Sequence, residues 1–174
     1  MIGRTALLCA ALLASACAAE AGPVGPVVDA ANILSPQAEQ SLDTRLGRYW
    51  DQKETAIVVA TVPSLKGETI DVTARRMFAD WGIGSAPTNR GVLVLIAPNE
   101  RSARIEVGCG LETVLTNAAA KHILEGEMLP RFKDGEFEAG STAGVEALIK
   151  RIDTANVAAG PVSPFCVEMM KDAA

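Results

Sequence analysis

Two uninterrupted apolar runs constrain the fold of this 174-residue chain more than any other feature. They are Thr55–Val62 and Gly91–Ala97, and neither contains a charged residue. A strand with one solvated face alternates apolar and polar residues, whereas a strand with helices on both faces is apolar throughout. The two runs therefore predict strands in the interior of a covered sheet.

Helices are predicted between and after these runs. Ser35-Pro36 is typical of a helix start, because serine caps free backbone amides and proline tolerates the first helical position. Apolar residues at helical spacing predict a helix from Pro36 past Tyr49. The same spacing predicts three later helices, at residues 69–81, at 117–128 with Pro130 closing it, and at about 138–152.

A hairpin completes the predicted sheet. Residues 98–102 have turn composition, and Ala103–Val107 alternates apolar and polar side chains. This predicts a strand antiparallel to Gly91–Ala97. Alternating strands and helices with buried strands predict an α/β fold, a short mixed β-sheet with helices on both faces.

The amino terminus is typical of an export signal. Arg4 precedes the apolar stretch Thr5–Ala16, which is too short to span a bilayer. Leu13–Cys17 resembles a lipobox, which predicts a lipid on Cys17; ordinary cleavage after Ala14-Ser15-Ala16 is the alternative. The predicted organisation is a signal peptide at 1–16, a tether at 17–27, a domain at 28–153 and a tail at 154–174.

The balance of basic and acidic residues excludes one class of binding partner. Because Arg4 leaves with the signal, 15 of the 16 basic residues remain against 21 acidic ones. Nucleic-acid binding requires a basic face, so this class is excluded. We expect a protein of the bacterial periplasm or cell envelope, attached to the membrane only through a lipid on Cys17.

Two cysteines remain in the mature domain and tail. In an oxidising compartment Cys109 and Cys166 are expected to form a disulfide that staples the tail to the domain. A reactive thiol at Cys109 is the alternative, although no neighbouring basic residue in the sequence would lower its pKa.

A polar, glycine-bearing segment follows the alternating strand. Glycines in Gly108-Cys109-Gly110 let a backbone approach a ligand closely, and Glu106 and Glu112 flank them. Calcium and magnesium take oxygen ligands. The predicted ligands are Asp29, Asp80, Glu106 and Glu112. The alternatives are a turn-forming role for Asp29 and solvated surface charges for the other three.

Two arginines are candidates for phosphate binding. Arg90 and Arg104 carry guanidinium groups, which suit oxyanions, and surface ion pairs with Glu100 or Glu106 are the alternative. The chain has no phosphatase nucleophile motif, and its single histidine, His122, lacks a triad partner. A metal-assisted hydrolase is the enzyme class that remains.

Five segments resemble the TPM domain, which is named for thylakoid-lumen, photosystem II repair and acetylcholine-receptor-auxiliary proteins. They are Val28–Ser35, Ile57–Val62, Phe78–Gly84, Asn89–Leu95 and Arg104–Glu112, within about residues 27–152. Cys109 departs from the usual tyrosine of the family, which strengthens the disulfide hypothesis.

The resemblance implies an exported α/β/α sandwich. Members are reported to bind calcium or magnesium, some are described as acid phosphatases, and eukaryotic relatives assist large membrane complexes. The expected function is therefore a lipid-anchored protein that binds calcium or magnesium and assists a membrane-protein complex or another envelope protein. The alternative is a metal-assisted acid phosphatase.

Overall fold

A four-stranded sheet forms the centre of the protein in a computed structural model that describes residues 24–84 and 88–155. The strands lie in the order β1 (Val27–Asp29), β2 (Ala56–Thr61), β3 (Gly91–Ala97) and β4 (Ser102–Val107). The first three are parallel, and β4 is antiparallel to β3. Both predicted interior strands and the predicted hairpin are confirmed. The three-residue strand β1 was not predicted.

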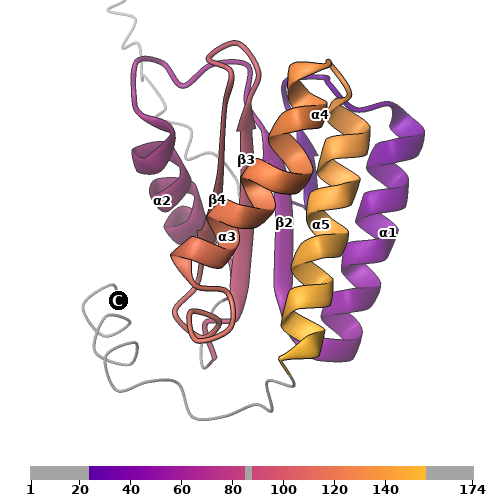
Figure 1. Ribbon diagram of the computed structural model, residues 1–174, viewed down its shortest axis with the longest axis vertical. Coiled ribbons are helices and arrows are strands. Elements are labelled where there is room, and N and C mark those ends of the chain that lie inside the picture. The colour runs from indigo at the N-terminus through magenta and orange to yellow at the C-terminus, as the bar shows by residue number, and fades with distance from the viewer. Residues whose placement is uncertain (1–23, 85–87, 156–174) are drawn as a thin grey trace, which may run out of the picture.

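Helices cover the two faces of this sheet, as Figure 1 shows. Among the described elements, α2 (Ile70–Asp80) packs on one face. The opposite face carries α1 (Pro36–Lys53), α3 (Asn117–Ile123), the π-helical turn η1 (Leu124–Met128), α4 (Leu129–Lys133) and α5 (Phe137–Thr154). The predicted mixed sheet with helices on both faces is therefore confirmed.

Strand β3 shows why the interior runs contain no charge. Val92, Val94 and Ile96 belong to the core shared with α1 and α5. Leu93 and Leu95 alternate with them and belong to the core under α2. All of these side chains are at most 1% exposed. A strand buried on both faces needs an apolar residue at every position.

Side-chain caps set the starts of three helices. Ser35, Thr69 and Thr116 each accept a hydrogen bond from a backbone amide three residues further along. Each cap satisfies one of the amides that the first helical turn leaves without a partner. The predicted starts of α1 and α3 therefore have a physical cause in the structure.

The predicted end of the third helix at Pro130 is wrong. The chain widens into η1 and then continues as α4 through Lys133. Pro130 lies in the first turn of α4, where a missing amide hydrogen does no harm. The polypeptide therefore passes Pro130 without leaving the helical path.

Helix α5 packs unusually closely on η1 and α4. A Cβ atom on Gly140 would lie 2.5 Å from Phe132 Cε1, and one on Gly144 would lie 2.5 Å from Met128 Sδ. Ser141 lies beside these glycines and is fully buried. Its hydroxyl has no hydrogen-bond partner among the described residues. The interface therefore contains a polar group that contributes no bond.

We expect Ser141→Ala to raise the free energy of unfolding by about 1 kcal/mol, because it removes an unsatisfied buried hydroxyl and improves helix propensity. Urea denaturation measures the change. Thr142→Ala is the matched control, since Thr142 is exposed on the same helix and gains only propensity, roughly 0.5 kcal/mol. A Ser141→Ala protein less stable than wild type would contradict the expectation.

Candidate functional site

The parallel strands place their carboxyl ends at one edge of the sheet. Asp29 is in register with Thr61, and Thr61 with Ile96. Because β4 is antiparallel, its last residue Val107 pairs with Val92 near the opposite edge. Ligands of open α/β sheets bind at the carboxyl ends of parallel strands. The edge that contains Asp29 is therefore the first place to look for a site.

Asp29 closes the loop between β1 and α1. Its Oδ1 accepts hydrogen bonds from the Thr61 hydroxyl at 2.5 Å and the Ile33 amide at 3.2 Å. Its Oδ2 accepts from the Leu34 amide at 2.8 Å. This is the turn-forming role that was the alternative to metal binding.

The other predicted metal ligands lie elsewhere. Glu106 is on the α2 face of β4, paired in register with Leu93, whereas Asp29 faces α1. Asp80 is exposed at the end of α2, and Glu112 is exposed beyond β4. Over residues 24–84 and 88–155, no three His, Cys, Asp or Glu side chains gather closely enough to hold a metal ion. A calcium or magnesium site stays a prediction.

The two predicted phosphate-binding arginines have partners within the fold. Arg90 is 9% exposed, and its Nε donates to Thr55 Oγ1 at 3.1 Å. Arg104 bridges Asp71 of α2 and Glu106 of β4, with Nη2 2.8 Å from Glu106 Oε2. Arg104 thus forms the ion pair with Glu106 that was the alternative to phosphate binding, and it ties α2 to the sheet.

The glycine segment after β4 approaches another loop of the same chain. A Cβ atom on Gly108 would lie 2.4 Å from Asn89 O, and one on Gly110 would lie 1.9 Å from Thr88 O. The Asn89 side chain also donates to Cys109 Sγ at 3.2 Å. These glycines therefore permit loop packing, where a close approach to a ligand was expected.

Two predictions on cysteines concern residues outside the described ranges. Cys166 and Cys17 both lie there, so the disulfide with Cys109 and the lipid on Cys17 stay predictions. The end of α5 is tied to the loop after β4, because Arg151 Nε donates to Val114 O at 2.9 Å. The last turn of α5 therefore lies against the loop that follows β4.

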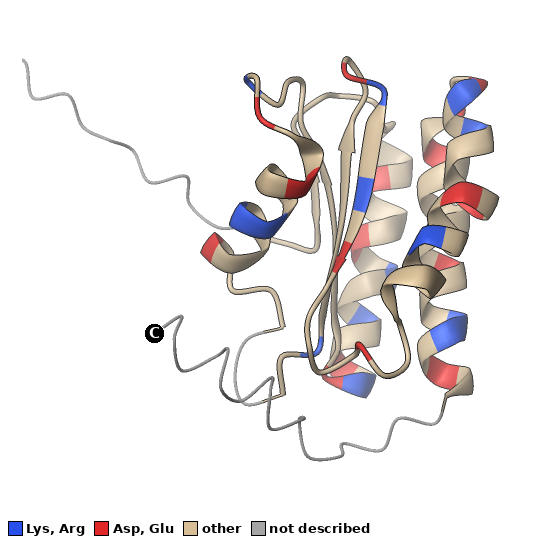
Figure 2. Ribbon diagram, turned by 60° about the vertical axis from the view of Figure 1, so that its left-hand side comes forward, with Lys and Arg blue, Asp and Glu red and all other residues tan. Residues whose placement is uncertain are grey.

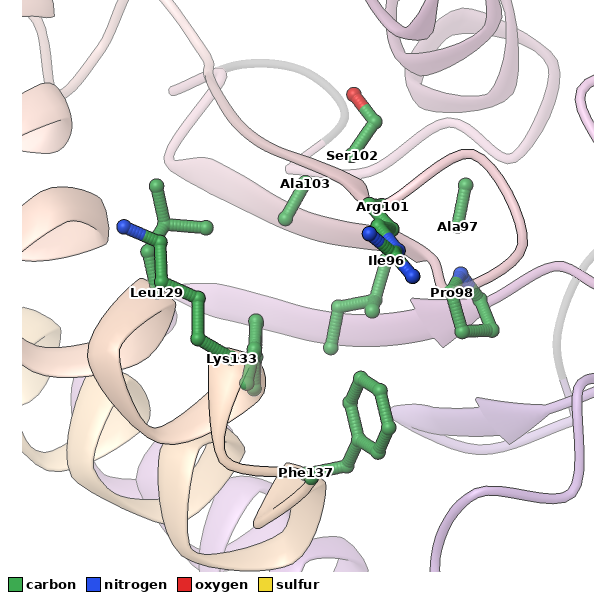
Figure 3. Close-up of a pocket in the computed structure, with 11 residues that line it drawn as sticks. Ile96, Ala97, Pro98, Arg101, Ser102, Ala103, Leu129, Lys133 and Phe137 are labelled. Carbon is green, nitrogen blue, oxygen red and sulfur yellow. The ribbon is translucent and has the colours of Figure 1, made fainter.

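A hollow of about 540 Å³ opens where the β3–β4 turn faces the loop between α4 and α5. Figure 3 shows Ile96 and Phe137 pointing toward one another inside it. Its apolar lining is Ile96, Ala97, Pro98, Ala103, Leu129, Phe132 and Phe137. None of its described lining residues is His, Cys, Asp or Glu. Sequence reasoning missed this hollow; its only signal was the apolar residues that continue beyond Pro130.

Two cationic side chains line this hollow. Arg101 and Lys133 are exposed, and neither forms an ion pair with another described residue. Glu100 precedes Arg101 in the sequence but forms its hydrogen bonds with another loop. Its Oε1 accepts from the Leu65 amide at 3.0 Å and from the Ser64 hydroxyl at 3.1 Å. These bonds, the Leu65 amide foremost, lower the pKa of Glu100. The hollow therefore combines an apolar interior with positive charge.

Known proteins share this architecture. No curated protein matches the chain. The N-terminal domain of a protein from P. gingivalis is similar, with a TM-score of 0.69 and 28% identity over 74% of this chain and 82% of that one. The N-terminal domain of cg2496 from Corynebacterium glutamicum has the same fold, with a TM-score of 0.59 and 14% identity over 80% of this chain and 84% of that one.

In the described part, no helix combines the length and apolar composition needed to cross a membrane.

The family assignment rests on the match of a family model to most of the chain. Residues 27–151 match the model of the TPM domain, from the first residue of β1 into the last turn of α5. The chain therefore belongs to the TPM domain family.

Proposed function

We propose that this TPM-domain protein is a binding module of the cell envelope and that the hollow beside Ile96 and Phe137 is its binding site. The hollow, about 540 Å³, falls within the roughly 300–1,000 Å³ of small-molecule sites. It lies at the carboxyl end of the parallel strands, where such folds bind ligands. This position and lining are the observation that carries the proposal.

The contacts favour a binding module over a metal-assisted acid phosphatase. Arg90 and Arg104, the predicted phosphate-binding residues, bond to Thr55, Asp71 and Glu106. His122 is exposed on α3 and lines a separate, shallower hollow with Lys150 and Arg151. General acid–base catalysis needs a proton-transferring group within hydrogen-bond reach of the substrate. Among the described residues that line the hollow, Lys133 is the one side chain of this kind, and no carboxylate, histidine or thiol accompanies it.

The proposal includes a bound cation, calcium or magnesium. Asp29 is the predicted ligand at the carboxyl edge of the sheet, and both of its oxygens already accept hydrogen bonds. A site there would combine one carboxylate with backbone carbonyls and water. Extracellular calcium sites reach dissociation constants of about 0.1–1 mM, and a single carboxylate supports binding at the weak end of that range.

The proposed attachment follows from the predicted lipid on Cys17 and the tether at 17–27. The tether joins the sheet at β1, whose Val27 is the first residue of a strand that runs toward Asp29. Val27 is in register with Val59 and, through it, with Val94, so the tether meets the sheet near its middle, two residues before the level of Ile96.

Site-specific photo-crosslinking in the cell envelope tests this proposal. A crosslinking residue at Lys133 should trap a discrete envelope partner, whereas one at Arg75, exposed on α2, should not. Ala103→Phe, which fills the hollow, should abolish the Lys133 product. Equal labelling at both positions would contradict the proposed site. Turnover of p-nitrophenyl phosphate by the purified protein with calcium or magnesium would support the phosphatase instead.

A further inference from the structure

We infer that the hollow binds a single-chain amphiphile with one anionic headgroup, such as a long-chain carboxylate or an alkyl phosphate. The inference rests on the proposed function, because it names the ligand class of the same site. The juxtaposition that carries it is an apolar interior between β3 and α5 with two cations, Arg101 and Lys133, on opposite sides.

The interior of the hollow favours apolar ligands over ligands that need several hydrogen bonds. Ile96 and Phe137 point into it, and Leu129 lines it from the side of α4 (Figure 3). The Ser102 hydroxyl points away from Ile96 and Phe137 in the same view. Sugars and nucleotides need several fixed polar contacts, which this lining does not offer. A flexible hydrocarbon chain needs none, and it gains free energy for each methylene that leaves water.

The two cations come from different elements and border the hollow on opposite sides. Arg101 ends the β3–β4 turn, and Lys133 ends α4. Arg101 has a φ of 50°, a left-handed conformation that a hairpin turn normally assigns to glycine or asparagine. An arginine there costs backbone free energy without forming an ion pair in the described part of the chain. A guanidinium and an ammonium are both groups that bind a carboxylate or a phosphate through charge-assisted hydrogen bonds.

The surroundings limit the ligand to a small negative charge. Asp134 and Glu136 are exposed and flank Gly135, which lines the hollow. Figure 2 shows acidic and basic residues interspersed along the helices, without a face of one sign. The chain as a whole has a formal net charge of -5. A polyanion would meet repulsion that a single headgroup at Arg101 or Lys133 avoids.

Calorimetric titration of the mature protein with three twelve-carbon ligands tests the inference. Laurate carries a carboxylate, monododecyl phosphate carries a phosphate, and monolaurin is neutral. We expect saturable binding of both anions below their critical micelle concentrations. Monolaurin should bind at least about tenfold more weakly, because it lacks the charge-assisted hydrogen bonds. The tighter of the two anions identifies the headgroup chemistry.

Three variants locate the binding site. Arg101→Gly removes the cation at a backbone conformation that glycine adopts freely, and Lys133→Gln removes the other. Each should weaken laurate binding about tenfold, and Ala103→Phe should abolish it. Lys66→Gly is the matched control, because Lys66 is an exposed cation with a φ of 52° outside the hollow. The Lys66→Gly protein should bind laurate with the affinity of wild type.

The inference is overturned if monolaurin binds as tightly as laurate, or if Arg101→Gly and Lys133→Gln bind laurate as Lys66→Gly does. Its failure is distinguishable from failure of the proposed function. Crosslinking at Lys133 that requires an open hollow, together with no binding of either anion, would keep the site and reject this ligand class. Absence of both would reject the site as well.

Discussion

Replacing Gly110 with alanine is expected to lower the free energy of unfolding by at least about 3 kcal/mol, at the upper end of overpacking effects. The new Cβ atom would lie 1.9 Å from Thr88 O and 2.9 Å from Asn89 O. Both obstacles are backbone atoms, so no side-chain rotation relieves the clash. The Gly110 amide also donates to Asn89 O at 3.1 Å, which holds the two loops together.

Gly47→Ala is the matched control for this substitution. Gly47 lies inside α1, and a Cβ atom there would meet nothing within 4 Å. Alanine should stabilise the helix by about 1 kcal/mol relative to glycine. Urea denaturation of both variants gives the comparison. Equal stability of the Gly110→Ala and wild-type proteins would mean that the loop at 88–89 moves aside at no cost, against the packing described above.

The fold could be predicted largely because its interior strands are buried on both faces. The runs around Val59 and Val94 contain no polar alternation, and the hairpin strand that contains Ile105 alternates as an edge strand should. Strand β1 escaped prediction because three residues have no usable periodicity, and its identity depends on pairing with β2. Local pattern predicts an element only where the element is long enough to have one.

The site was harder to predict, because residue type does not say which partner a side chain meets. Arg104 has the chemistry of a phosphate ligand, but Asp71, more than 30 positions away, is its neighbour in the fold. The hollow could not be predicted, because the helix was expected to end at Pro130. In the structure α4 continues beyond Pro130, and this path brings Phe132 and Phe137 to the hollow that Ile96 lines. Such contacts arise from tertiary structure and leave little trace in the sequence.

We expect Asp29→Ala to lower the free energy of unfolding by about 3 kcal/mol in a buffer that contains EDTA. The substitution removes the acceptor for the Thr61 hydroxyl and for the Ile33 and Leu34 amides. Thr61 is 1% exposed and Leu34 is 9% exposed, so water cannot readily replace the lost partner. A buried donor without an acceptor costs about 1–3 kcal/mol. Asp29→Asn keeps one acceptor oxygen and should lose less.

The same variants separate the loop-closing role of Asp29 from the proposed cation site. Urea denaturation with EDTA isolates the hydrogen bonds, and Asp80→Ala, which removes only an exposed ion pair of 3.9 Å, should change stability by less than about 0.5 kcal/mol. If a cation binds at Asp29 with a dissociation constant near 1 mM, then 10 mM calcium or magnesium should stabilise wild type by about 1.4 kcal/mol. Asp29→Asn should gain nothing from the ion. A cation that stabilises wild type and Asp29→Asn equally binds elsewhere. If Asp29→Ala in EDTA loses less than about 1 kcal/mol of unfolding free energy, the three hydrogen bonds contribute little to closing the loop.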